Sequence, residues 1–272
     1  MARTAECILI NVTLPNYLTH TWRRKIPFTF AHPAAVLPFV KYKRYFHIPA
    51  MVLGSMAPDF EYFLRGDPIG IYGHTLLGAV LLDLPLAAIV YLVGRRVVFE
   101  PVTPYLPGFL QVTGAGKTRR FRPLELLIFL YSALAGIFTH IAWDSFTHLN
   151  GAMVNRIPAL RETILIDAYE IPVFKFLQHG STLAGFILLA GFLLYTGKRR
   201  AVDGRMDKTL TSKFLFWIIL GCMALSIFAL WFLLSAISVR DYGIIIVRLI
   251  DSMILSLLLV SLALKSRRRL SA

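Results

Sequence analysis

Charge, and negative charge above all, is scarce in this chain of 272 residues. Asp and Glu together number 15, and charged residues make up only 16% of the sequence, whereas hydrophobic residues make up 57%. A soluble fold of this length could not bury so much apolar surface and still cover itself with polar groups. The same hydrophobicity excludes a disordered chain, which needs few apolar residues and many charged ones. The composition therefore indicates an integral membrane protein.

Cysteine is also rare, since the chain has only Cys7 and Cys222. The two residues lie in unrelated segments, and Cys222 falls within an apolar run, so we expect no disulfide between them. Two cysteines are too few for a disulfide scaffold. The 18 glycines and 14 prolines follow no period, which excludes a collagen-like chain.

Long apolar stretches, in contrast, are plentiful. About 20 helical residues cross a bilayer. The candidate spans are Leu76–Val93, Leu124–His148, Thr182–Tyr195, Phe214–Ile237 and Ile244–Leu264. The third is short and needs flanking residues to cross. Between Phe28 and Leu64 the chain is apolar but broken by proline and glycine, which favours short interfacial helices or re-entrant pieces. The predicted fold is all-α, a polytopic membrane bundle of about five transmembrane helices plus short interfacial helices.

The predicted organisation has three parts. An N-terminal extension covers residues 1–26, a membrane domain with a metal site covers residues 27–182, and further transmembrane helices cover residues 183–272.

Basic residues are numerous, and 29 Lys and Arg give the chain a formal net charge of +14. They cluster between apolar stretches, as is typical of cytoplasmic loops. The clusters are Arg95-Arg96, Lys117–Arg122, Lys198–Lys213 and Lys265–Arg269. No alternation of aromatic and basic residues marks a nucleic-acid platform, so membrane lipids are the expected partners. This pattern predicts a multi-pass protein of the bacterial inner membrane with a cytoplasmic C-terminus. The eight Lys and Arg of residues 1–75 do not follow this charge rule, because the orientation places them on the outer side of the membrane.

A His-x-x-x-Asp-x-x-x-His pattern, formed by His140, Asp144 and His148, is the strongest local signal. Positions i, i+4 and i+8 share one helical face, drifting ~40° and rising ~6 Å per step. Asp144 can therefore share one cation with His140 and another with His148. The two histidines, ~12 Å apart along the axis, cannot reach the same ion. The alternative is a structural His–Asp hydrogen bond within the bundle, but ionisable groups inside a span are costly and usually functional.

Further polar residues lie at or near the ends of apolar segments: His32, Asp59, His74 and His179. In the orientation derived from charge, His74, the His140–His148 pattern and His179 lie at one membrane face. Imidazoles and carboxylates suit Zn²⁺ or a similar ion. The sequence thus predicts a divalent metal site, with one or two zinc ions. Asp59 follows a Gly-Pro turn, where capping of a helix is the simpler role.

From Pro27 to Thr182 the chain resembles an uncharacterised bacterial membrane family, domain of unknown function 4184. The matching pieces contain His32, Pro58-Asp59-Phe60-Glu61, Gly73-His74-Thr75, Thr139–His148 and Gln178-His179-Gly180. More distantly, the order of these motifs is similar to that of membrane-bound metal-dependent hydrolases and of the zinc-dependent phospholipase C and nuclease P1 superfamily. This resemblance implies a primary metal site, bridged by Asp144, and a further zinc. The implied ligands are His32, Asp59, His74, His140 and Asp144 for the primary site, and His148 and His179 for the further zinc. The superfamily's His-x-x-x-Glu element is absent, because Leu183 stands at that offset from His179.

These observations favour a membrane-bound metal-dependent hydrolase of phosphoesters, such as an anionic phospholipid. Asp59 or Glu61 would orient or deprotonate the attacking water. The alternative is a transporter or assembly factor whose His–Asp cluster binds a cation or proton, and a third hypothesis is a structural module. Distances between the candidate ligands distinguish these hypotheses.

Overall fold

The structure, a computed structural model, describes residues 29–111, 122–167, 169–198, 208–235 and 237–270. Within these residues five helical segments are long and apolar enough to cross a membrane, which confirms the all-α polytopic fold. They span Leu76–Tyr105, Pro123–Thr147, Val173–Gly197, Leu210–Leu234 and Tyr242–Arg268. The predicted N-terminal extension lies outside the described residues.

The first of these segments is a chain of short helices. It consists of α4 (Leu76–Gly78), the π-helix η3 (Ala79–Asp83), α5 (Leu84–Val93), the π-helix η4 (Gly94–Val98), α6 (Phe99–Val102) and the 3₁₀ turn η5 (Thr103–Tyr105). The segment is longer than predicted because it continues through Arg95 and Arg96, whose long side chains can extend away from the apolar helix surface. The 3₁₀ turn η6 (Gly108–Leu110) follows.

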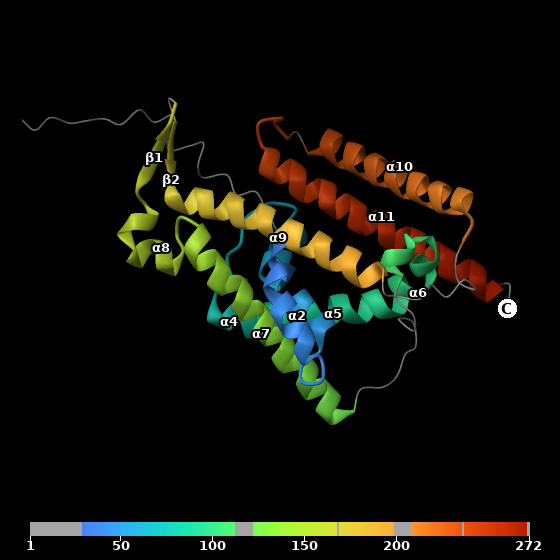
Figure 1. The fold of residues 1–272 in the computed structure, drawn as a ribbon. Coiled ribbons are helices and arrows are strands. Elements are labelled where there is room, and N and C mark those ends of the chain that lie inside the picture. Colours follow the sequence, from blue (N-terminus) through green and yellow to red (C-terminus); the bar gives the residue numbers. More distant parts are fainter. Residues whose placement is uncertain (1–28, 112–121, 168, 199–207, 236, 271–272) are drawn as a thin grey trace, which may run out of the picture.

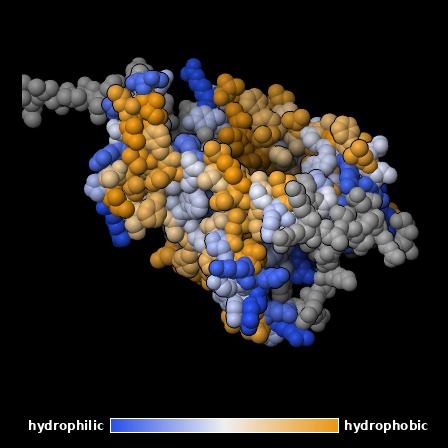
Figure 2. Space-filling view, in the orientation of Figure 1, coloured by the Kyte–Doolittle hydropathy of each residue, from blue (hydrophilic) through white to orange (hydrophobic). Residues whose placement is uncertain are grey.

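The other spans are single helices: α7 (Pro123–Thr147), α9 (Val173–Lys198), α10 (Leu210–Leu234) and α11 (Tyr242–Leu270). The third predicted span, Thr182–Tyr195, does gain flanking residues, because α9 begins nine positions earlier. In Figure 1, α10 and α11 lie along one side of the molecule and α7 along the other, with α9 between them. Orange surface dominates much of the face in Figure 2, as expected of helices that contact lipid.

Residues 29–54 form a helical hairpin inside the bundle. Its arms are the 3₁₀ helix η1 (Thr29–Tyr42) and α2 (Ile48–Gly54), and α2 packs along α7. At the return of the hairpin, the backbone N–H of His47 donates to Ser132 Oγ at 2.9 Å. Just after α2 ends, the backbone carbonyl of Ser55 accepts a hydrogen bond from His140. His140 lies two turns beyond Ser132 on α7. The hairpin thus enters and leaves at the same end of the bundle, as the broken apolar sequence allowed.

Glycine permits this close packing. A Cβ atom on Gly136 of α7 would lie 2.1 Å from the carbonyl oxygen of Met51, and one on Gly54 would lie 2.1 Å from that of Ala133. Only a residue without a side chain fits at either position, so the two backbones meet directly.

The tip of the hairpin carries exposed Lys41, Lys43 and Arg44, close in sequence to His47. His47 Nε2 lies 3.1 Å from the hydroxyl of Tyr91, to which Arg95 donates a hydrogen bond at 3.2 Å. The tip therefore lies on the side of the bundle where Arg95 lies. The disagreement noted for the basic residues of positions 1–75 does not extend to these three.

Short elements connect the larger ones. The 3₁₀ turn η2 (Ala57–Asp59) and α3 (Phe60–Arg65) follow the hairpin. Between α7 and α9 lie α8 (Ala152–Arg156), the 3₁₀ turn η7 (Pro158–Leu160) and an antiparallel pair of strands, β1 (Thr163–Ile166) and β2 (Tyr169–Pro172). Ile164 pairs with Ile171 and Ile166 with Tyr169. The strands, which the sequence analysis did not predict, project from the bundle beside α8 (Figure 1).

Candidate metal centre

Four distant segments bring imidazole and carboxylate groups together at one end of the bundle. Helix α7 supplies His140 and Asp144, one turn apart on its buried face. η1 supplies His32, the turn η2 supplies Asp59, and the loop before α4 supplies His74. The five primary ligands predicted from the sequence thus lie in one cluster, which we call the His–Asp cluster.

Three donor atoms of this cluster lie about as far apart as the ligands of a tetrahedral zinc site, and a fourth lies near two of them. His74 Nε2 lies 3.3 Å from His140 Nε2, and each of these nitrogens lies 3.4 Å from Asp144 Oδ2. Asp59 Oδ1 lies 3.6 Å from His74 Nε2 and 3.7 Å from His140 Nε2. A tetrahedral zinc ion with its usual bond lengths keeps its ligand atoms about 3.3 Å apart. The donor set therefore fits a divalent metal of the zinc type.

His140 is oriented as a metal ligand should be. Its side chain is completely buried, and its Nδ1–H donates to the backbone carbonyl of Ser55 at 2.8 Å. This hydrogen bond leaves the lone pair on Nε2, the nitrogen that faces His74 and the carboxylates. An outer hydrogen bond of this kind is typical of metal-bound histidines, because it fixes both the tautomer and the ring plane.

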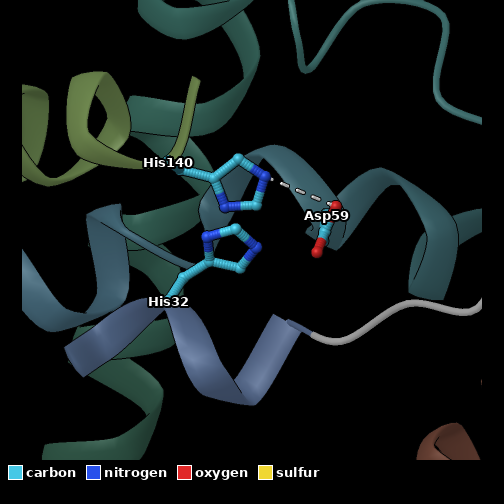
Figure 3. Close-up of side chains that lie close together, drawn as sticks. All are labelled: His32, Asp59 and His140. Atoms are coloured by element: carbon cyan, nitrogen blue, oxygen red, sulfur yellow. Dashed lines mark ion pairs between the residues drawn. The ribbon is translucent and has the colours of Figure 1, made fainter. Parts of the chain in front are cut away.

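His32 stacks on His140, with ring centroids 3.8 Å apart and an interplanar angle of 25°. Its Nε2 lies 3.6 Å from Asp144 Oδ1. Burial, and then the neighbouring His140, lower the pKa of His32 to about 4, so this imidazole is neutral at physiological pH. Neutral imidazole is the form that binds metals. Figure 3 shows the two rings side by side, with the Asp59 carboxylate facing His140.

Asp144 has its two oxygens turned toward different partners. Oδ2 faces His74 and His140, whereas Oδ1 faces His32 and, at 3.4 Å, His148 Nδ1. Within the described residues, two sets could each hold an ion: His32 with Asp59 and His140, and His74 with His140 and Asp144. The second set and the divided oxygens of Asp144 are compatible with the bridging role that the resemblance implied.

Asp59 is held by residues that the sequence analysis missed. Thr29 Oγ1 donates to Asp59 Oδ2 at 2.6 Å, which leaves Oδ1 directed at the histidines. Tyr62 is buried, and its ring stacks on His74 at 6.0 Å. Burial, followed by the charges of the nearby carboxylates, raises the pKa of Tyr62 far above its ordinary value, so it remains a hydroxyl donor. No local sequence motif marks Thr29 or Tyr62, because their partners Asp59 and His74 come close only when the chain folds back.

Glu61, one of the two predicted catalytic groups, has both oxygens occupied by hydrogen bonds. Oε2 accepts the backbone N–H groups of Ile71, Tyr72 and Gly73 at 2.9–3.0 Å, and Oε1 accepts Arg65 at 2.9 Å. Burial alone would raise the pKa of Glu61, but these donors lower it below its ordinary value. Glu61 therefore holds the loop that carries His74. Its catalytic role stays a prediction, as does that of Asp59.

The two histidines predicted for a further zinc lie at the edge of the cluster or beyond it. His148 follows the last turn of α7 and contacts Asp144 and Gln178. His179 lies on an exposed part of α9. Neither belongs to the two potential ligand sets of the described chain, and their role as metal ligands stays a prediction.

Asp83, whose role the sequence left open, is fully buried in η3. Neither carboxylate oxygen has a hydrogen-bond partner within the described part of the chain. Oδ1 lies against Gly73, only 3.2 Å from where a Cβ atom would stand, so Asp83 sits just beneath the loop that carries His74.

Five apolar helices with a buried His–Asp cluster at one end define a polytopic membrane protein with a candidate metal centre. The chain belongs to the family described as domain of unknown function (DUF4184), which matches residues 26–262. This match confirms the family resemblance and extends it over most of the C-terminal hairpin. Comparisons with curated proteins and with solved structures gave no match.

Proposed function

We propose that this protein is a membrane-bound metal-dependent hydrolase that cleaves a phosphoester at the membrane surface. The observation that carries the proposal is the close approach of His74 Nε2, His140 Nε2 and Asp144 Oδ2 at 3.3–3.4 Å, with Asp59 Oδ1 at 3.6 and 3.7 Å from the two nitrogens. Structural histidines need one partner each, whereas here four donors from three segments converge. One or two zinc ions would be held by these groups together with His32.

The place of the cluster in the bundle supports hydrolysis over transport. His74 precedes the first span, and Asp144 lies in the last turn of α7. Transport sites typically lie near the middle of the bilayer. The side chain of His74 is 29% exposed, whereas that of His140 is fully buried. The cluster therefore has one accessible side, from which a lipid headgroup could approach.

The side chains suit the chemistry of phosphoester hydrolysis. A bound divalent metal would polarise the phosphoryl oxygen and lower the pKa of water. Asp59, with Oδ2 fixed by Thr29, is placed to orient or deprotonate the attacking water, and Glu61 is the alternative base. We further propose an anionic phospholipid as substrate and the bacterial inner membrane as location, with a cytoplasmic C-terminus. The basic clusters around Arg95 and Lys265 support that orientation.

A cation- or proton-transporting protein is the second candidate, and Asp83 is the observation that favours it. A buried carboxylate in the first span, with no hydrogen-bond partner among the described residues, is a costly feature that typically marks an ion or proton path.

The test is to purify the full chain in detergent and measure bound metal by mass spectrometry. We expect one or two zinc ions per chain in the wild type and less than about a tenth of that in Asp144→Asn and His140→Ala. Asp251→Asn is the matched control, since this residue lies in α11 outside the cluster. Phosphate or headgroup release from vesicles of anionic phospholipid should follow the metal content and stop with a chelator.

Wild-type protein without stoichiometric metal would refute the proposal. A zinc-loaded protein that hydrolyses no phosphoester but takes up protons or cations in sealed vesicles would favour transport.

A further inference from the structure

The loop of residues 66–75, which joins α3 to α4 and carries His74, has an apolar surface. Ile69, Ile71 and Tyr72 expose 52%, 54% and 59% of their area. Connecting loops are ordinarily polar because they face water. Large exposed apolar side chains that stand so close together typically mark a contact with another molecule or with a membrane. We call this segment the His74 loop.

The backbone of the His74 loop is held from below. Glu61 Oε2 accepts the N–H groups of Ile71, Tyr72 and Gly73 at 2.9–3.0 Å. A Cβ atom on Gly73 would lie only 2.3 Å from the carbonyl oxygen of Pro58, so the loop also packs directly on the turn η2. The fold itself therefore displays the apolar side chains on the outer surface of the loop.

The same loop borders the accessible edge of the His–Asp cluster. A Cβ atom on Gly70 would stand 3.4 Å from His74 Nδ1, so the backbone between Ile69 and Ile71 lies against the ring of His74. The side chain of His74 is 29% exposed, whereas those of the other four predicted primary ligands are at most 12% exposed. The ligand that a substrate can reach most easily is thus flanked by apolar side chains.

The apolar surface of the loop continues into the first span. A Cβ atom on Gly78 of α4 would lie 1.9 Å from the carbonyl oxygen of Tyr72, so the loop backbone touches the first turn of that span. The large apolar residues that follow on the exposed surface of the span are Leu76 (73%), Leu77 (71%), Val80 (51%) and Leu81 (67%). A membrane-spanning segment presents such residues to the acyl chains of the bilayer. Because the two surfaces are continuous, the same lipid meets the His74 loop.

We propose that the His74 loop is an apolar lip at the membrane surface, along which a lipid substrate passes from the bilayer to the His–Asp cluster. Ile69, Ile71 and Tyr72 contact the acyl chains while the phosphoryl group lies at the exposed edge of His74. Tyrosine is typical of the membrane–water interface. This inference rests on the proposed hydrolase function and specifies its substrate: a phospholipid with long acyl chains that enters from the bilayer, and not a phosphoester dissolved in water.

The test compares two forms of one substrate on the full, zinc-loaded chain in phosphatidylcholine nanodiscs. Long-chain phosphatidylglycerol or phosphatidic acid is supplied within the bilayer, and the dihexanoyl form of the same lipid is supplied from water. Ile69→Ser/Ile71→Ser removes apolar contacts with the acyl chains, so kcat/KM for the long-chain lipid should fall about 10-fold or more. For the dihexanoyl form it should stay within about twofold of wild type, and the zinc content should not change.

Val239→Ser is the matched control. Val239 is 78% exposed in the loop between α10 and α11. This loop lies at the same end of the bundle, because Arg248, near the start of α11, donates to the Gly66 carbonyl. Val239 does not belong to the His74 loop, so its substitution should leave kcat/KM unchanged for both substrates.

A second measurement needs no activity. A nitroxide spin label is attached to Ile71→Cys, in a chain whose two native cysteines are replaced by serine. Collisions with lipid-soluble oxygen should exceed collisions with a water-soluble nickel chelate, as for a label at Leu81→Cys in the first span. A label at Asn150→Cys, an exposed polar position after α7, should show the opposite order.

The inference is overturned if the double serine variant loses activity equally on both substrates, or on neither. A label at Ile71→Cys that meets the nickel chelate as readily as the label at Asn150→Cys also overturns it. In these results the wild type still hydrolyses phosphoesters, so the proposed function survives. A wild type that hydrolyses neither substrate removes both proposals.

Discussion

The part of the molecule that holds the His–Asp cluster (residues 29–198) and the C-terminal hairpin (α10 and α11) differ in how their buried polar groups are partnered. In the first, His32, Asp59 and His140 come from segments far apart in the sequence and meet within a few ångströms (Figure 3). In the hairpin, Arg248 and Asp251 lie three positions apart on one helix. Arg248 Nη1 and Asp251 Oδ2 are buried without a hydrogen-bond partner in the described chain.

The contact between α2 and α7 is packed more closely than the C-terminal hairpin. Gly136 of α7 touches the backbone of α2, whereas Gly221 of α10, like Gly180 and Gly191 of α9, has nothing within 4 Å of its missing Cβ in the described chain. Arg248 joins the regions: its Nε donates to the Gly66 carbonyl at 3.3 Å, and its guanidinium lies 4.8 Å from the ring of Trp231. A functional site is therefore indicated by convergence of distant groups, and not by the mere presence of charge in a span.

The largest expected effect is on packing. Gly136→Ala places a methyl group against the Met51 carbonyl, so α2 and α7 must separate, at a cost of about 3 kcal/mol in unfolding free energy. Gly221→Ala, the same change in α10, should be neutral or stabilise by up to about 1 kcal/mol. Thermal unfolding in detergent measures both. Equal effects would mean that the α2–α7 contact is packed no more closely than the surroundings of Gly221.

Removal of the Thr29 hydroxyl should come next. Thr29→Val keeps the shape of the side chain but removes the hydrogen bond to Asp59 Oδ2, and zinc affinity should fall about 10- to 100-fold. Thr29→Ser restores the donor and should recover most of the affinity. Chelator competition provides the measurement, and unchanged affinity in Thr29→Val would show that Asp59 needs no outer support.

Glu61→Gln should destabilise the protein by about 2 kcal/mol at neutral pH, because it removes charged hydrogen bonds to the loop before His74. The pKa of Glu61 is lowered, so its contribution is complete above the ordinary pKa of the carboxyl and is lost as pH falls through the lowered value. The difference in melting temperature between wild type and variant should therefore shrink in acid.

Glu125→Gln is the control for that experiment, since Glu125 accepts a backbone N–H at the exposed start of α7, away from the loop before His74. It should cost no more than about 0.5–1 kcal/mol. A pH-independent difference for Glu61→Gln would contradict the role assigned to its charge.

The smallest effect concerns the contact between the regions. Arg248→Met loses the hydrogen bond to Gly66 and the contact with Trp231, which together contribute about 1 kcal/mol. Metal content should not change, because Arg248 lies outside the His–Asp cluster. Loss of zinc in this variant would show that the hairpin belongs to the site, and Arg240→Met in the exposed loop before α11 is the matched control.

Much of the site could be predicted because its residues stand out locally. His140 and Asp144 share one helical face within a span, and His74 precedes an apolar run, so each was visible as a costly polar group. Thr29, Ser55 and Tyr62 could not be identified from the sequence. Serine, threonine and tyrosine are common residue types, and their contacts with Asp59, His140 and His74 depend on segments that are distant in the sequence. Glu61 was identified as a candidate, but its loop partners became visible only in the structure.

The sequence by itself determined the five spans, the all-α class and the residues able to bind a metal, because hydropathy and helical spacing act over neighbouring positions. Tertiary structure decided how deep residues 29–54 enter the bundle, and hence where Lys41, Lys43 and Arg44 lie. It also decided which nitrogen of His140 carries the proton. Both depend on long-range packing: a glycine that lets two backbones touch, and hydrogen-bond partners that only the fold brings within reach.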